Sequence, residues 1–181
     1  MATGSTIAYI GLGSNLGDRA GNLLLAVRCL MEASFSVEKL SCIYETEPVG
    51  MEGGPFLNMV AEVSVRDISP TQMMARLLRI EYLLDRRDKG EKRPRTIDLD
   101  ILFYGETKLD TEFLILPHPR LHLRKFVLQP LHEIAPAWRH PGMKCLISDL
   151  FEKCDDPNWV RRWDPNAEVA AALLDAQPRS K

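Results

Sequence analysis

The chain lacks an excess of charge of either sign and lacks any long apolar segment. Its 181 residues carry 23 lysines and arginines against 25 aspartates and glutamates, a formal net charge of −2. General nucleic-acid binders have a clear basic excess, so this balance speaks against that class. No stretch approaches the roughly 18 apolar residues of a membrane helix, and the N-terminus lacks a basic segment followed by an apolar run of signal-peptide length. We therefore expect a cytoplasmic protein that binds neither nucleic acid nor membrane.

Cysteine is scarce as well, and its spacing excludes the common cysteine-based sites. The sequence has four cysteines, none in a C-x-x-C pair or a Cys/His zinc pattern: Cys29, Cys42, Cys145 and Cys154. Two of them lie in patterned apolar segments, where cysteine commonly acts as a small core residue. Structural disulfides are therefore not expected, and a reducing compartment fits.

The most informative segment runs from Arg95 to Tyr104 and places two carboxylates inside an apolar strand pattern. Side chains alternate between the faces of a strand, so Asp98 and Asp100 should share one face. The other face should hold the apolar positions Ile97, Leu99, Ile101 and Phe103. Two carboxylates about 7 Å apart on one face repel each other unless a cation lies between them. Such oxygen ligands suit Mg²⁺, which binds through one or two carboxylates and substrate phosphates.

A strand whose outer face is simply solvated would also explain an isolated Asp-x-Asp pattern. Aspartate is depleted in strands, however, so two of them on one face need a reason. Basic residues that could contact phosphate lie on both sides of the pair, at Arg95, Arg120 and Arg124. We therefore favour a metal site at Asp98 and Asp100.

Apolar periodicity and turn residues predict the order of elements along the chain. We expect strands over 7–13, 35–44, 56–65 and 97–104, helices over 18–33, 70–85, 125–134 and 146–151, and a short hairpin return over 106–109. We expect Ser69 to be an N-cap residue, because serine is favoured there, with Pro70 at the first helical position. The β-α-β-β-α-β order indicates an α+β fold, a ferredoxin-like antiparallel sheet with helices packed on it and added C-terminal elements.

This topology makes a prediction about which segments meet. The first and fourth strands should be neighbours near the middle of the sheet, so Gly13-Ser14-Asn15 should share a cleft with Asp98 and Asp100. We expect a single domain over residues 1–160 and a C-terminal tail of uncertain order over 161–181.

Four separated segments together match one family. They are Gly13-Ser14-Asn15-Leu16-Gly17; Tyr44-x-Thr46-x-Pro48-x-Gly50 with Phe56-Leu57-Asn58; Pro94-Arg95-Thr96-Ile97-Asp98-Leu99-Asp100-Ile101-Leu102; and Pro117-His118-Pro119-Arg120 with Arg124, Phe126 and the stretch 130–136. In this order and spacing they closely resemble the 6-hydroxymethyl-7,8-dihydropterin pyrophosphokinase family of folate biosynthesis. The likeness covers residues 7–136, and the Asp-containing segment is its most specific part.

The resemblance implies transfer of a pyrophosphoryl group from ATP to the hydroxymethyl group of the pterin, with release of AMP. Two Mg²⁺ ions held by Asp98 and Asp100 would clamp the triphosphate and neutralise the leaving oxygen. The resemblance also implies a pterin site. Phe56 and Phe126 match its two stacking aromatics and Asn58 the residue that reads the ring edge, with further edge contacts at Thr46 and at the backbone near Val49. Without the family, both phenylalanines would be interpreted as ordinary core residues.

The ATP site follows from the same resemblance. It maps onto Glu81, Arg95, His118 and Arg124, with Ile101 beside the adenine. The charged loop over 86–95 matches a lid that contributes an arginine to the phosphates. We choose Arg87 for that role, with Arg86 as the alternative, and count Arg87 and Arg95 with the two aspartates as catalytic. The loop departs from many relatives, because Lys92-Arg93 stands where they have Trp-Gly or a similar pair.

Two other classes are compatible with parts of the sequence. A nucleic-acid module on the same fold would need a Lys/Arg-Gly-Phe-x-Phe aromatic platform, which the strands lack. A nucleotide-sugar transferase with an Asp-x-Asp motif would lack the paired aromatic slot. We expect a monomer whose partners are ATP and the pterin.

Overall fold

An antiparallel sheet of six strands is the centre of the fold in the computed structural model, which describes residues 4–48, 53–85 and 94–166. The strands are β1 (Thr6–Ser14), β2 (Ser36–Leu40), β3 (Tyr44–Thr46), β4 (Phe56–Val65), β5 (Asp98–Tyr104) and β8 (Val160–Arg162). Their order is β5-β1-β4-β3-β8, and β2 pairs with another part of β4. The predicted ferredoxin-like α+β arrangement is confirmed.

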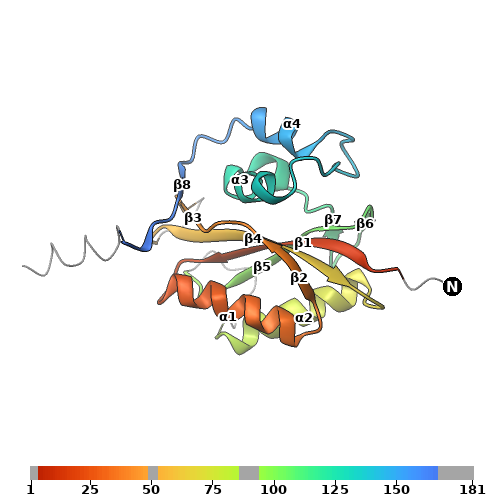
Figure 1. Ribbon diagram of the computed structural model, residues 1–181, viewed down its shortest axis with the longest axis horizontal. Helices are drawn as coiled ribbons and strands as arrows, with labels where there is room; N and C mark the ends of the chain where they lie inside the picture. The colour runs from red at the N-terminus through yellow and green to blue at the C-terminus, as the bar shows by residue number, and fades with distance from the viewer. Residues whose placement is uncertain (1–3, 49–52, 86–93, 167–181) are drawn as a thin grey trace, which may run out of the picture.

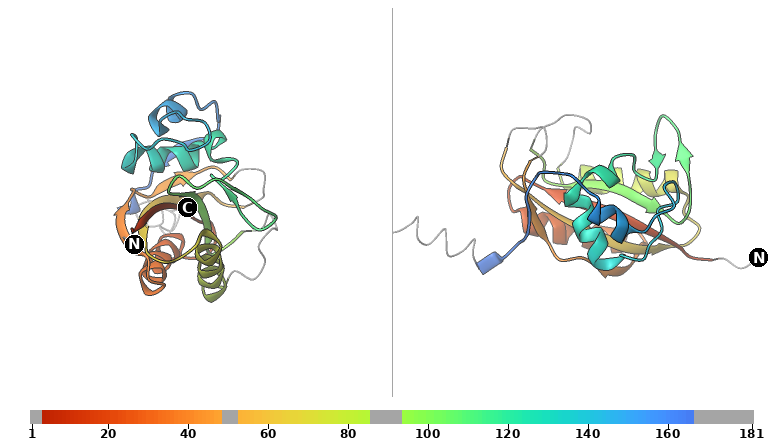
Figure 2. Two further views of the ribbon diagram at one scale, coloured as in Figure 1. Left: turned by 90° about the vertical axis from the view of Figure 1, so that its right-hand side faces the viewer. Right: turned by 90° about the horizontal axis from the view of Figure 1, so that it is seen from above.

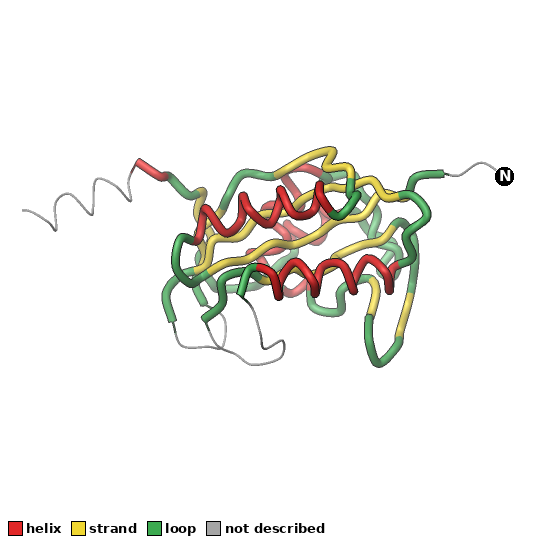
Figure 3. The backbone as a smooth tube through the Cα atoms, turned by 90° about the horizontal axis from the view of Figure 1, so that it is seen from below, coloured by secondary structure: helices red, strands yellow, loops and turns green. Residues whose placement is uncertain are grey.

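Helices cover both faces of this sheet, which gives three layers (Figures 1 and 2). α1 (Arg19–Glu32) and α2 (Pro70–Leu83) lie side by side on one face, as Figure 3 shows from below. α3 (Lys125–Ile134) and the short α4 (Ile147–Glu152) lie on the other face. A hairpin of β6 (Leu109–Asp110) and β7 (Ile115–Leu116) and a 3-10 turn, η1 (Leu121–Leu123), connect β5 to α3.

Local sequence signals set the starts of the two long helices. The Asp18 side chain accepts a hydrogen bond from the Gly21 N–H and caps α1. At α2, Ser69 and Gln72 form a reciprocal capping box and Pro70 occupies the first turn. The predicted N-cap is therefore confirmed.

Two apolar cores result from the three layers. The first, between the sheet and α1/α2, includes the predicted β4 face: Leu57, Met59, Ala61 and Val63. The second lies between the sheet and α3/α4 and includes Tyr9, Val60, Phe103, Leu128 and Leu131. Because β4 alternates between the two cores, nine of its ten residues are buried.

The predicted strand over 35–44 is two strands instead of one. Ser41 interrupts it: its hydroxyl accepts a hydrogen bond from the Val60 N–H at 2.9 Å and donates to the Cys42 carbonyl at 2.7 Å. A serine that bonds nearby backbone competes with a regular ladder, so β2 ends at Leu40 and β3 begins at Tyr44. The hairpin return predicted over 106–109 is also wrong, because the paired strands are β6 and β7.

The strict alternation predicted along β5 fails at Phe103. Tyr9 of β1 pairs with Phe103, yet Ile10 pairs with Ile101, so Leu102 is an extra residue on β5. This β-bulge turns Phe103 into the second core beside Leu102, whereas Leu99 and Ile101 stay in the first. β5 is also at the edge of the sheet, not near its middle, although it pairs with β1 as predicted.

The sheet extends further along the chain than the sequence indicates. Val160–Arg162 form β8, which pairs antiparallel with β3. Arg161 and Arg162, which we assigned to the tail, therefore belong to the sheet. Within the described part of the chain, no helix has the length and apolar character needed to cross a bilayer.

The second core contains a histidine that should make stability depend on pH. His140 is 6% exposed, and its Nδ1 accepts hydrogen bonds from the N–H groups of Gly142 and Met143, both at 3.1 Å. Burial lowers the pKa of His140 below 6.5, and the nearby His122 lowers it further. Protonation therefore favours the unfolded chain.

We expect the free energy of unfolding to fall as the pH drops from 6.5 toward the lowered pKa of His140. The slope should shrink in His140→Gln, which cannot titrate there. Urea unfolding between pH 7.5 and 5 measures both chains. An equal slope in the variant would contradict the assignment.

Candidate active site

Gly13 lies between two of the predicted site residues. In the sheet register it pairs with Asn58 of β4 on one side and with Asp98 of β5 on the other. A Cβ atom at Gly13 would lie 2.8 Å from the Asn58 side-chain oxygen, so any larger residue would displace the Asn58 amide. The turn and the Asp-x-Asp strand are therefore neighbours, as predicted.

The two aspartates lie on the sheet face opposite α1 and α2. Leu99 between them is fully buried in the first core, which directs Asp98 and Asp100 to the α3 side, where both are half-buried. An Arg95 guanidinium nitrogen, Nη1, is 2.9 Å from Oδ2 of Asp98. One of the two carboxylates thus has a cationic partner within the chain.

Arg95 is itself held by Asn15, which we expected in the same cleft but did not count among the site residues. The Asn15 N–H donates to the Arg95 carbonyl at 3.1 Å, and Oδ1 of Asn15 accepts from the Arg95 N–H at 2.8 Å. Asn15 is 7% exposed. It belongs to the Gly-Ser-Asn-Leu-Gly motif, and its buried amide in a turn was the signal that could have identified it.

The predicted pterin residues form two walls. On the sheet, the Asn58 side-chain N–H donates to the Thr46 hydroxyl at 2.7 Å, and both residues and Phe56 are buried. On α3, Phe126 is half-buried against the second core. Val49 lies outside the described residues.

An arginine covers each of the two predicted stacking rings. The guanidinium carbon of Arg95 is 5.6 Å from the centroid of Phe56, and that of Arg124 is 5.4 Å from the centroid of Phe126. Both are cation–π contacts. The two arginines that we predict to bind phosphate therefore touch the two rings that we predict to bind the pterin.

His118 lies beside Asp100 and Arg124. Its N–H donates to the Leu102 carbonyl of β5, and its Nδ1 accepts from the Arg120 N–H at 3.2 Å. Burial lowers the pKa of His118; Asp100 opposes this shift, whereas Arg124 and Arg120 add to it. A neutral ring with Nδ1 as acceptor carries its proton on Nε2, which is then available as a donor.

Two predicted ATP residues have their side chains on the other side of β5. Glu81 of α2 is 2% exposed, and its Oε1 accepts from the Leu99 N–H at 2.7 Å on the open edge of the strand. The Ile101 side chain is buried in the first core, so Ile101 can meet a nucleotide only through its backbone. Their ATP contacts stay predictions. Arg86 and Arg87 lie outside the described residues.

The donor set fits a magnesium ion that is completed by substrate. Asp98 and Asp100 provide hard oxygen ligands on one strand face. Among the described residues, no group of three or more His, Cys, Asp and Glu side chains could hold a metal by itself. Mg²⁺ commonly takes its remaining ligands from phosphates and water.

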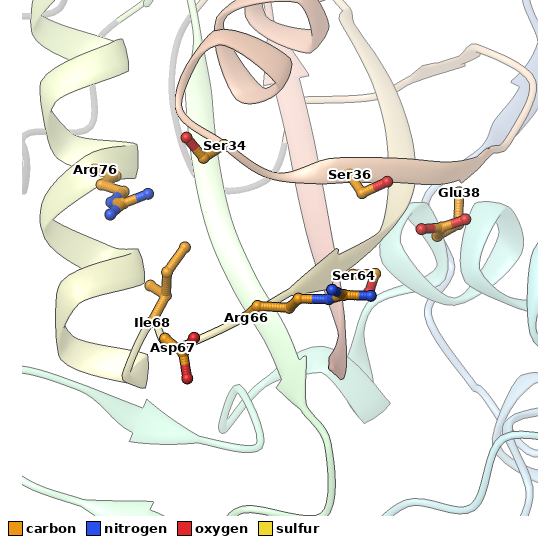
Figure 4. A pocket seen from close by; sticks show the side chains of 8 residues that line it. All are labelled: Ser34, Ser36, Glu38, Ser64, Arg66, Asp67, Ile68 and Arg76. Atoms are coloured by element: carbon orange, nitrogen blue, oxygen red, sulfur yellow. The ribbon is translucent and has the colours of Figure 1, made fainter. Parts of the chain in front are cut away.

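A separate hollow of about 440 Å³ lies near the far end of β4, on the α1/α2 side (Figure 4). Its polar lining includes Arg66 and Arg76 together with Glu38 and Asp67. Because β4 runs from Phe56 at the site to Val65, this hollow is distant from the residues described above. It takes no part in the candidate active site.

The pairing of Asn15 with Arg95 gives a testable expectation. Asn15→Ala leaves the partly buried Arg95 N–H without its acceptor, which should lower the free energy of unfolding by about 1 kcal/mol. Asn15→Asp keeps an oxygen in that place and should lose less. Urea denaturation of the three chains measures the difference, and an Asn15→Ala variant as stable as the parent would contradict it.

Comparisons with known proteins show the family of the chain. The family model for 7,8-dihydro-6-hydroxymethylpterin-pyrophosphokinase (HPPK) matches residues 9–136. A 2-amino-4-hydroxy-6-hydroxymethyldihydropteridine pyrophosphokinase of Bacillus subtilis is 46% identical over 132 residues, which is 72% of this chain and 78% of the relative. The corresponding protein of Aquifex aeolicus is 38% identical over 74% of this chain and 82% of its own length.

A solved structure shares the fold. A crystal structure of Plasmodium falciparum HPPK-DHPS aligns with a TM-score of 0.68 at 17% identity, over 84% of this chain and 46% of that one. The residues matched by the family model enclose the described site from Gly13 to Phe126. This chain therefore belongs to the 7,8-dihydro-6-hydroxymethylpterin-pyrophosphokinase family.

Proposed function

We propose that the ends of β1, β4 and β5 hold ATP and 6-hydroxymethyl-7,8-dihydropterin together for pyrophosphoryl transfer. The chain is a pyrophosphokinase of folate biosynthesis, and ATP is its co-substrate. The observation that carries the residue assignment is the register that places Gly13 between Asn58 and Asp98. Asn58 reads the pterin edge there, and Asp98 lies two strands away, about 10 Å from it.

This spacing suits an in-line reaction. A pterin held by Asn58 and Thr46 can direct its hydroxymethyl group across Gly13 toward Asp98 and Asp100. The hydroxyl oxygen forms a bond to the β-phosphorus of ATP, the bond from that phosphorus to the α-β bridging oxygen breaks, and AMP leaves. The hydroxyl proton goes to solvent or to a phosphate oxygen.

Asp98 and Asp100 are the residues that would hold Mg²⁺, two ions in our proposal. Bound there, magnesium would supply charge neutralisation on the triphosphate and the leaving oxygen. Arg95, Arg124 and the Nε2–H of His118 add fixed donors for the phosphates. Glu81 supports this arrangement through the Leu99 N–H, and Arg87 is the residue that we propose to join the phosphates from the loop over 86–95.

The arginines on the aromatic rings suggest that the nucleotide prepares the pterin slot. The face of Phe56 that Arg95 covers, and the face of Phe126 that Arg124 covers, cannot also stack on a pterin. A triphosphate attracts both guanidinium groups more strongly than a neutral ring does. ATP binding would therefore release both rings for the pterin.

The first test is removal of each metal ligand. Asp98→Ala and Asp100→Ala should each lower turnover more than about a hundredfold, because a lost metal ligand costs several kcal/mol in the transition state. Asp100→Ala should leave the fold intact or slightly more stable, since it relieves repulsion. Asp98→Ala also loses its ion pair with Arg95 and should not gain stability.

Single-turnover AMP release from Mg-ATP, with and without the pterin, measures these variants against Asp110→Ala. Asp110 is an exposed aspartate of β6 and serves as the matched control. Turnover within about tenfold of the parent in either β5 variant would remove the metal assignment.

The second test concerns the order of binding. We expect the pterin to bind more tightly in the presence of a non-hydrolysable ATP analogue than in its absence. Arg95→Ala and Arg124→Ala each uncover one ring and should reduce that difference, because the nucleotide then has less to release. Calorimetric titration of the pterin provides the affinities. A pterin affinity unaffected by the analogue in the parent chain would contradict the proposed coupling.

A further inference from the structure

The segment Asp156–Arg162, which we call the C-terminal strap, contacts both walls of the proposed pterin slot. It lies beyond residues 9–136, which the family model matches. It runs from the start of α3 to the free side of β3, and Figure 1 shows it descending from α4 to β3. The proposed reaction has so far given this strap no role.

At the helical wall, the strap holds the start of α3. Oδ2 of Asp156 accepts a hydrogen bond from the Lys125 N–H at 2.9 Å, and Oδ1 accepts from the Asn158 N–H at 3.1 Å. α3 has no side-chain cap from its own N-cap residue, Arg124, so Asp156 supplies one from a distant part of the chain. Phe126 is the next residue along the helix, so the strap acts one residue from this wall.

At the sheet wall, the strap turns β3 into an interior strand. β3 has only three residues, and β8 pairs with all of them: Tyr44 with Arg162, Glu45 with Arg161 and Thr46 with Val160. The Glu47 N–H also donates to the Trp159 carbonyl at 3.3 Å. A three-residue edge strand would hold Thr46 against Asn58 through few bonds, so β8 stabilises this wall.

Charged side chains on the α1 face of the sheet also hold β8 in place. Nε of Arg161 donates to Oε2 of Glu45 at 3.0 Å, and Nη1 of Arg19 donates to Oε1 at 3.0 Å. Arg19 also donates to the Pro55 carbonyl at 3.0 Å, directly before Phe56. Glu45 therefore connects the strap to both strand ends that carry the sheet wall, β3 at Thr46 and β4 at Phe56.

The two acidic residues of these contacts are in their charged forms at neutral pH. Burial would raise the pKa of Glu45, but hydrogen bonds from Arg161 and Arg19 outweigh it and lower that pKa. Burial likewise opposes ionisation of Asp156, and the N–H groups of Lys125 and Asn158 lower its pKa. Trp159 supports these charged side chains as well, because the Arg161 guanidinium lies 5.1 Å from its ring centroid.

We propose that the C-terminal strap is a positioning element that sets the distance between the two pterin walls, through Asp156 at α3 and Arg161 at Glu45. This rests on the proposed assignment of Thr46, Phe56, Asn58 and Phe126 to the pterin. None of the strap side chains reaches the metal ligands Asp98 and Asp100 in the described contacts. The strap therefore controls pterin affinity, and only its Asp156 contact adjoins a proposed phosphate residue, because Lys125 follows Arg124 directly.

The test compares two strap variants with their chain neighbours. Asp156→Ala and Arg161→Ala should each weaken pterin binding at least about fivefold, measured in the presence of a non-hydrolysable ATP analogue, the lower end of typical coupling between sites. The affinity for the analogue itself should change less than about twofold in Arg161→Ala, because Glu45 is not a proposed phosphate residue, and less than the pterin affinity in Asp156→Ala. Asp155→Ala and Arg162→Ala, both at exposed positions, are the matched controls and should bind the pterin like the parent chain.

Conservative variants keep the test valid if a truncation impairs folding. Arg161→Lys retains the charge but donates from one nitrogen in place of a planar fork, and Asp156→Asn retains an acceptor, so each should recover part of the pterin affinity. Arg161→Ala should have little further effect in a Glu45→Ala background, because Glu45→Ala already removes the acceptor of Arg161. Thermal unfolding of every variant accompanies the titrations.

The outcomes separate the strap from the pterin assignment. Unchanged pterin affinity in both strap variants, or an equal loss of pterin and analogue affinity, overturns the positioning role. Asn58→Ala tests the pterin wall independently. If it leaves pterin affinity unchanged, the wall assignment is wrong and the strap proposal falls with it; if it weakens the pterin while both strap variants do not, only the strap proposal is wrong.

Discussion

The hydrogen-bonded register of β1 between β4 and β5 is the constraint on which the site depends. β1 pairs antiparallel with both neighbours, so each of its residues from Ala8 to Gly13 faces one residue on either side. This places the amide of Asn58, the backbone of Gly13 and the carboxylate of Asp98 in one row across the sheet. A shift of one residue would turn either side chain to the opposite face. Gly13 allows the row to form because no side chain stands between the two polar groups.

Features set by neighbouring residues could be predicted from the sequence. The capping of α2 at Ser69, the bounds of β4 and α3, and the common face of Asp98 and Asp100 all follow from local chemistry and periodicity. The β1–β5 pairing required a topology rule in addition, because its partners are about ninety residues apart. Each of these features follows a sequence pattern that the tertiary contacts of this fold leave unchanged.

Features set by distant contacts could not be predicted in this way. The bulge at Leu102 depends on how β5 fits β1 and the second core, so the period-2 pattern misplaced Phe103. Ser41 interrupts a strand because Val60 is opposite it. Asn15 matters because Arg95 lies beside it, and β8 exists because β3 leaves an unpaired side. In each case the partner is at least nineteen residues away in the chain, so only the tertiary structure shows which residue it is.

The three-layer arrangement has a consequence for the order in which the chain folds during synthesis. Residues through Tyr104 contain five of the six strands of the sheet and both helices of the first layer, so this part can assemble as soon as it leaves the ribosome. The opposite face of the sheet, with Tyr9, Val60 and Phe103, has no cover until α3 follows. A nascent chain at that stage presents an apolar sheet surface, which makes the interval between β5 and α3 the one at which a chaperone would be most useful.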